Sequence, residues 1–184
     1  MNGNVYVLLA DGFEEIEALT PTDVLRRAGL NVITVGISGE SAVGAHGIAV
    51  KCDVCAADGS YSLTDPAALV IPGGMPGAEN IDRFAKIDEY IKSTLASGGF
   101  VGAICAAPMV LGKRGYLRGR RATCFPGFEK YLDGAVLACD DAVRDGNIVT
   151  SRCMGTALPF ALALAECLIG KERRDALECA VMGR

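Results

Sequence analysis

The chain has 184 residues, 51% of them hydrophobic, and a formal net charge of −4. This length suits one domain, residues 1–184, that can bury a core without disulfide or metal staples. The acidic balance and the lack of a basic cluster argue against nucleic acid or an anionic membrane as partner, and no apolar stretch reaches spanning length. The first residues lack the pattern of a signal peptide, so we expect a cytoplasmic location.

Short apolar runs alternate with helical patterns along the first two thirds of the chain. Strands are expected at residues 5–10, 31–36, 67–71 and 100–104. Helices are expected from Glu14 toward Gly29, where Pro21 should kink or restart the helix, and over 87–95, with an irregular hairpin at 43–51. This alternation predicts a doubly wound α/β fold with a mostly parallel sheet.

The last third of the chain combines strand, hairpin and helix patterns. Residues 121–125 are strand-like, and residues 142–150 form a hairpin pattern around Asp145-Gly146. A long helix is expected from about Thr156 to Gly170, and its near-continuous apolar face implies burial against the sheet or another subunit.

Cys105 is the main candidate for a reactive side chain. It follows the apolar run 100–104 directly and precedes Ala106-Ala107-Pro108, which opens a helical pattern. A thiol at such a strand-to-helix turn faces free N–H groups and a positive helix end, which favour the thiolate. The turn loosely resembles a nucleophile elbow. The alternative is that Cys105 is a small core residue.

Two further groups should meet Cys105, because ligands bind at the carboxyl ends of strands in open α/β sheets. Glu17 follows the first strand and could handle a proton if its pKa is raised by burial, whereas Glu14 and Glu15 fit better as acids that complement a helix start. Gly73 and Gly74 follow the third strand, where their N–H groups could approach an oxyanion or could simply form a tight turn.

The remaining motifs carry weaker signals. His46, the only histidine, lies between glycines and is interpreted as an exposed turn residue with nothing to orient it. The pair Cys52 and Cys55 matches C-x-x-C but has no second pair for zinc. No phosphate-binding glycine motif follows a strand. Most other cysteines are expected to be buried apolar residues. They are Cys139, Cys153, Cys167 and Cys179.

Several motifs together resemble the ThiJ/PfpI superfamily, in the branch of Parkinson disease protein 7 and YajL. They are residues 9–17, residues 21–29, Ile71-Pro72-Gly73-Gly74, Ala103 to Pro108, and Thr150-Ser151-Arg152. The resemblance covers nearly the whole chain and implies a flavodoxin-like three-layer sandwich of the class I glutamine amidotransferase-like kind, usually a homodimer.

The same resemblance implies a readily oxidised Cys105 whose sulfur is hydrogen-bonded by Glu17, with the amides of Gly74 and Ala106 lining an oxyanion or sulfinate site. The implied activities need no cofactor or metal. They are conversion of methylglyoxal to lactate, removal of early glycation adducts from protein side chains, and oxidative-stress sensing or chaperoning.

The chain departs from the family pattern at two places. Phe125 stands where many members have a histidine, so that position cannot transfer a proton, and Cys124 becomes a candidate second redox thiol near Cys105. Cys153-Met154 replaces the usual glycine-proline after Ser-Arg, close to the expected dimer-facing site.

Three hypotheses follow from the sequence. The leading one is a cysteine-dependent enzyme for small reactive aldehydes or their adducts, in which Cys105 attacks the carbonyl carbon and Glu17 moves the proton. The second is a non-enzymatic redox sensor or chaperone that signals through oxidation of Cys105. The third is a purely structural domain, which an ordinary thiol pKa at Cys105 would support.

Overall fold

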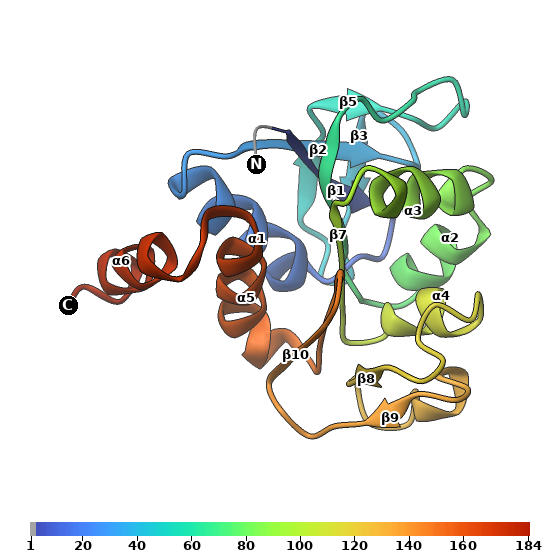
Figure 1. Ribbon diagram of the computed structural model, residues 1–184. Coiled ribbons are helices and arrows are strands. Elements are labelled where there is room, and N and C mark those ends of the chain that lie inside the picture. Colours follow the sequence, from blue (N-terminus) through green and yellow to red (C-terminus); the bar gives the residue numbers. More distant parts are fainter. Residues whose placement is uncertain (1–2) are drawn as a thin grey trace.

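The computed structural model describes residues 3–184. Within them a seven-stranded sheet lies between two groups of helices, with strand order β10-β11-β7-β6-β1-β2-β5 (Figure 1). Every neighbouring pair is parallel except β10 with β11. The strands are β1 (Asn4–Leu9), β2 (Asn31–Gly36), β5 (Val54–Cys55), β6 (Pro66–Ile71), β7 (Phe100–Ile104), β10 (Ala142–Asp145) and β11 (Ile148–Ser151). The predicted α/β fold with a mostly parallel sheet is confirmed.

The helices form the two outer layers (Figure 1). On one side lie α1 (Glu15–Arg27), α5 (Ala157–Ile169) and α6 (Lys171–Met182), and on the other lie α2 (Gly77–Arg83), α3 (Ile87–Ala96) and α4 (Pro108–Gly112). The smaller elements are the β3 (Ser41–Val43) and β4 (Ala49–Lys51) hairpin, the paired β8 (Arg121–Ala122) and β9 (Val136–Leu137), and the 3-10 helices η1 (Glu129–Tyr131) and η2 (Met154–Thr156).

The sheet is apolar on both faces because each face packs on its own helices. In β1, Val5 and Val7 belong to the core beneath α1 and α5, whereas Tyr6 and Leu8 belong to the core beneath α2 and α3. A strand covered on both sides needs an almost continuous apolar sequence. None of the helices in residues 3–184 has the length and apolar character needed to cross a membrane.

Two expected elements differ from the structure. The strand expected at 121–125 ends at Ala122, because the next backbone groups bond to other partners. The Thr123 N–H donates to the Thr150 hydroxyl at 3.0 Å and the Phe125 N–H donates to the Cys105 carbonyl at 2.8 Å. The long helix expected up to Gly170 is α5, and it ends there as predicted. A further helix, α6, follows directly and was not predicted, because its mostly polar sequence has no apolar stripe.

Two other expectations need correction. Helix α1 is continuous through Pro21, so the proline does not restart it. Four cysteines expected to be buried are not, because they lie at loops, helix ends or solvent-facing helix positions: Cys139 and Cys179 are exposed, and Cys153 and Cys167 are half-buried.

Candidate active site

Cys105 stands at the turn between β7 and the segment leading into α4, as the sequence predicted. Its φ is +64°, a left-handed conformation that costs a non-glycine residue about 1–2 kcal/mol. The turn is held by the Cys105 N–H, which donates to the Ser151 carbonyl at 2.9 Å, and by the Cys105 carbonyl, which accepts from Phe125. These two bonds fix the strained backbone so that the side chain leaves the sheet edge.

Glu17 lies in the first turn of α1 and is 1% exposed. Its Oε2 accepts the Gly73 N–H at 3.0 Å, and its carboxyl group is hydrogen-bonded to the Cys105 thiol. The structure therefore brings together the cysteine, the glutamate and the glycine turn that the sequence places after three different strands.

The N–H groups of Gly74 and Ala106 donate hydrogen bonds to the Cys105 sulfur. Gly74 has a φ of +83°, and a Cβ there would lie 2.3 Å from the Glu14 nitrogen and 2.5 Å from the Gly12 oxygen. A Cβ on Gly73 would lie 2.6 Å from Glu17 Oε2. Both glycines are thus required for the close approach of this turn to the site.

Burial and the interaction between the two groups shift the pKa values of Glu17 and Cys105. Burial raises the pKa of Glu17 to about 7. Burial and the charge of Glu17 raise the pKa of the Cys105 thiol, while the two backbone N–H groups lower it. The negative charge of ionised Glu17 disfavours the thiolate, so a proton on Glu17 lowers the cost of ionising Cys105.

This result corrects the expectation of a thiolate stabilised by a helix dipole. Helix α4 begins only at Pro108 and has five residues. The raised pKa of Cys105 shows that burial and the neighbouring carboxylate outweigh the backbone donors. The Cys105 thiol therefore keeps its proton at neutral pH, and Glu17 is the carboxyl group with the largest effect on it.

A cavity of about 150 Å³ opens onto this pair. It is lined by Glu14, Glu17, Gly74, Cys105, Phe125, Cys153 and Met154. Phe125, at the position where the family pattern has a histidine, lines the cavity with an aromatic ring that cannot move a proton. Proton transfer at Cys105 is left to carboxylates.

His46 is exposed, as expected, but it does have partners that orient it. Its Nδ1 lies 2.9 Å from Glu15 Oε2 and 3.4 Å from Glu14 Oε2, and its backbone N–H donates to Glu15 Oε1 at 2.8 Å. The hydrogen bond with Glu15 raises the pKa of His46. Burial alone would raise the pKa of Glu15, but its bonds with His46 hold that pKa below the usual value.

The side chains of Glu14, Glu15 and His46 are also the one group, within residues 3–184, whose potential metal-ligand atoms gather within 4.8 Å. The interpretation of Glu14 and Glu15 as acids that only complement the helix start was therefore incomplete. Glu15 is 4% exposed and binds the histidine, and Glu14 forms part of the wall around Cys105.

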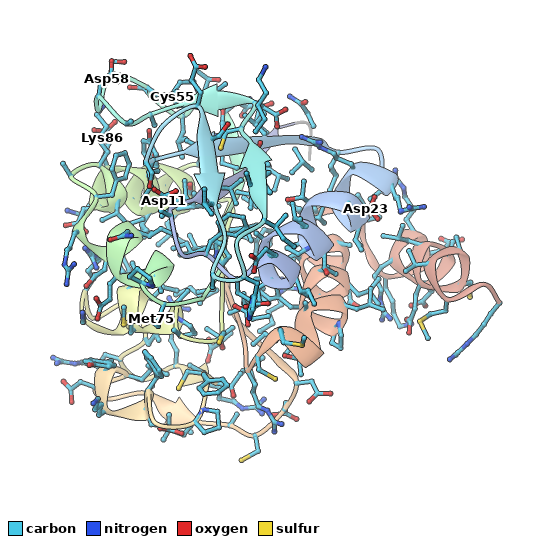
Figure 2. The ribbon with its side chains drawn as sticks, turned by 180° about the vertical axis from the view of Figure 1, so that it is seen from behind. Asp11, Asp23, Cys55, Asp58, Met75 and Lys86 are labelled. Atoms are coloured by element: carbon cyan, nitrogen blue, oxygen red, sulfur yellow. The ribbon has the colours of Figure 1, made fainter. Side chains whose placement is uncertain are left out.

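The other candidate thiols lie in separate cavities. Cys124 is buried beside a cavity of about 300 Å³ that it shares with Cys139 and Arg152, and burial raises its pKa to about 11. Cys52 and Cys55 line another cavity, and Cys55 sits at the end of the edge strand β5 (Figure 2). A redox role for Cys124 stays a prediction, without a place in the cavity around Cys105.

Gly74→Ala is expected to destabilise the protein by about 3 kcal/mol, because a Cβ would meet backbone atoms that have no room to move. Gly98→Ala is the matched control, since Gly98 has a φ of +75° and no atom within 4 Å of a Cβ. Urea denaturation of both variants separates the clash from the left-handed backbone cost of about 1 kcal/mol. Equal losses in the two variants would contradict the requirement for glycine at 74.

Sequence reasoning did not place Cys153 and Met154 at the cysteine, although it noted that they depart from the family pattern. Their position follows from β11 lying beside β7, with Ser151 paired to Ile104. The chain order of the strands does not reveal that neighbourhood.

Comparison with known proteins identifies the family. The model of the DJ-1/PfpI family matches residues 3–167. The chain is 38% identical to the protein dj-1beta of Drosophila melanogaster over 176 residues, covering 94% of this chain and 93% of that one. It is 34% identical to the Parkinson disease protein 7 homolog of Danio rerio, covering 90% and 89%.

It is also 37% identical to the glutathione-independent glyoxalase DJR-1.2 of Caenorhabditis elegans, covering 89% of this chain and 87% of that protein. The crystal structure of Drosophila DJ-1beta superposes with a TM-score of 0.89 at 34% identity, over 99% of this chain and 98% of the other. The motifs around Cys105, the flavodoxin-like fold and these matches together show that the chain belongs to the DJ-1/PfpI family.

Proposed function

We propose that the protein is a cofactor-free, cysteine-dependent enzyme of the glyoxalase or deglycase type, acting on small reactive carbonyl compounds or on early glycation adducts of protein side chains. The observation that carries the proposal is the Cys105 sulfur, held by the N–H groups of Gly74 and Ala106 and hydrogen-bonded to Glu17 at the wall of a cavity. A volume of about 150 Å³ suits a small carbonyl compound better than a large ligand.

The first step forms a hemithioacetal. Cys105 gives its proton to Glu17 and its sulfur attacks the aldehyde carbon, so that a C–S bond forms and the electron pair of the C=O bond moves to oxygen. The backbone donors lie beside this oxygen and stabilise its charge until Glu17 returns the proton.

For methylglyoxal the remaining steps need no oxidant. Ionised Glu17 removes the hydrogen of the former aldehyde carbon as a proton and returns a proton to the neighbouring carbon, which gives a thioester. Water then cleaves the C–S bond, releasing lactate and the Cys105 thiol. The sum is methylglyoxal plus water to lactic acid.

Lactate formation from methylglyoxal without glutathione tests this mechanism in the wild type, Cys105→Ser and Glu17→Ala. Both variants should be slower than the wild type. A variant of either residue that keeps the full rate would show that the mechanism is wrong.

The alternative is a redox sensor or chaperone in which oxidation of Cys105 is the signal. Phe125 in the cavity wall favours it, because its ring stands where the family pattern has a histidine and cannot move a proton during turnover. After mild peroxide treatment, mass spectrometry should find Cys105 oxidised first among the eight cysteines. Oxidation spread evenly over them would contradict a sensor role.

For either activity we propose a single domain of residues 1–184 acting as a homodimer in the cytoplasm. The apolar side chains of Ile16 and Leu19 on the outer face of α1, both more than a third exposed, are compatible with a subunit contact. Sedimentation analysis of the purified chain tests the dimer.

A further inference from the structure

Two cysteines line the cavity of the candidate active site. Cys105 and Cys153 line it together with Glu17 and Met154. Cys153 is half-buried, so that its thiol is accessible without being fully in solvent. None of the proposed carbonyl chemistry uses Cys153.

The sheet places these two residues close together. Strands β7 and β11 are adjacent and parallel, and their last paired residues are Ile104 and Ser151. Cys105 is the first residue after β7, and Cys153 is the second residue after β11. The hydrogen bond from the Cys105 N–H to the Ser151 carbonyl keeps the two chain segments together beyond the last paired residues. Continuing this register would place Cys105 opposite Arg152 and Cys153 one residue further along. A strand spacing of about 4.8 Å with a rise of about 3.3 Å per residue corresponds to roughly 6 Å, within the Cα separations that disulfides bridge.

The backbone around Cys153 is anchored, and its side chain takes part in the capping box at the start of η2. The Cys153 N–H donates to Thr156 Oγ1 at 3.1 Å, and Thr156 Oγ1 lies 2.7 Å from Ser151 Oγ. Residues 152 and 153 lie outside the sheet, and a Cβ added at Gly155 would have the Cys153 sulfur as its nearest neighbour, 3.9 Å away. A change of rotamer toward the cavity therefore gives up the capping contact of Cys153 with η2 but breaks no hydrogen bond of the sheet.

We propose that Cys153 is the resolving cysteine of Cys105, so that a hydroperoxide converts the pair into an intramolecular disulfide. The Cys105 sulfur, with its proton on Glu17, attacks the peroxide. An S–O bond forms, the O–O bond breaks, and an alcohol or water leaves with the proton. Cys153 then loses its proton and attacks the sulfenic sulfur, so that the S–S bond forms and the S–O bond breaks, and the departing hydroxide takes up the proton from Cys153 and leaves as water.

This bond would make oxidation of the site reversible. Two electrons pass from the two thiols to one peroxide, and a dithiol reductant returns them. Without a resolving thiol, the sulfenic acid reacts with a second peroxide and becomes the sulfinic acid, which ordinary thiols do not reduce. The inference rests on the same reactive Cys105 as the proposed function but requires no turnover of a carbonyl compound.

Cys124 and Cys139 form the internal comparison. They also share a cavity, but Cys124 is buried. Within residues 3–184, neither sulfur has a hydrogen bond with a carboxyl group like the one between Cys105 and Glu17. If sharing a cavity were sufficient, this second pair would oxidise as readily as the first.

The experiment compares the reduced wild type, Cys153→Ser and the control Cys139→Ser after a small excess of hydrogen peroxide over protein, alkylation and non-reducing peptide mapping. Trypsin places Cys105 alone in residues 93–113 but places Cys153 together with Cys167 in residues 153–171. A Cys167→Ser background therefore assigns the bond. Cys153→Ala is a second variant, in case the serine variant folds poorly by circular dichroism.

The wild type and Cys139→Ser should give a dithiothreitol-sensitive link between residues 93–113 and 153–171. Both Cys153 variants should lose that link and accumulate about tenfold more Cys105 sulfinic acid. Equal sulfinic acid with and without Cys153, a link from Cys105 to Cys124, or a link between two copies of the chain would overturn the proposal. Lactate formation is measured separately, so that a disulfide without lactate rejects only the proposed enzyme, and lactate without a disulfide rejects only this inference.

Discussion

Cys105→Ser is expected to lower the rate of lactate formation from methylglyoxal by about 10³-fold or more. A serine hydroxyl fits the same left-handed turn and the same backbone donors, but its much higher pKa prevents proton transfer to Glu17. The hemithioacetal therefore no longer forms at a useful rate. The measurement is initial lactate production without glutathione at fixed substrate concentration.

Cys179→Ser is the matched control, because Cys179 is an exposed thiol on α6. It should keep the wild-type rate. Circular dichroism of both variants establishes that the comparison concerns chemistry and not folding. A Cys105→Ser protein that retains more than about a tenth of the rate would exclude nucleophilic catalysis by this residue.

Glu17→Gln is expected to remove a loss of stability that the wild type shows as pH rises. Burial raises the pKa of folded Glu17 to about 7 from its ordinary value of 4.5. Between these pH values the unfolded carboxyl is ionised while the folded one keeps its proton, so the folded state binds more protons. The free energy of unfolding therefore falls with rising pH, by about 3 kcal/mol across the window.

Urea denaturation at pH 4.5 and pH 8 measures this difference. His46 and Glu15 also contribute to the pH dependence, but they are present in both proteins, so the comparison of wild type with Glu17→Gln isolates Glu17. Glu172→Gln, an exposed change on α6, should reproduce the wild-type slope. The expectation fails if Glu17→Gln loses as much stability between the two pH values as the wild type.

The sequence predicted the central strands closely because each is a short apolar run that must be buried on both faces. Residues 31–36 and 100–104 match β2 and β7. The expected strand at 121–125 was too long, because the N–H groups of Thr123 and Phe125 donate hydrogen bonds to partners that are distant in sequence. Helix α6 escaped prediction because only Leu177 of its residues is buried.

At the candidate site, the residues were predictable from the rule that ligands bind at the carboxyl ends of the strands in an open α/β sheet. The protonation states of these residues were not predictable. The rule brought Glu17, Gly74 and Cys105 together. The pKa of Cys105 depends on burial and on the charge of one particular neighbour, which only atomic positions reveal. The same holds for His46, whose partner Glu15 is thirty-one residues away in sequence.

The walls of the cavity come from positions as far apart as Glu14 and Met154. They meet only when β11, β7, β6 and β1 stand side by side, which requires most of the sheet to be complete. A nascent or heat-unfolded chain therefore carries an ordinary cysteine at position 105, without its proton acceptor or its N–H donors. The environment that distinguishes the Cys105 sulfur from an ordinary thiol therefore exists only in the folded state and is lost on global unfolding.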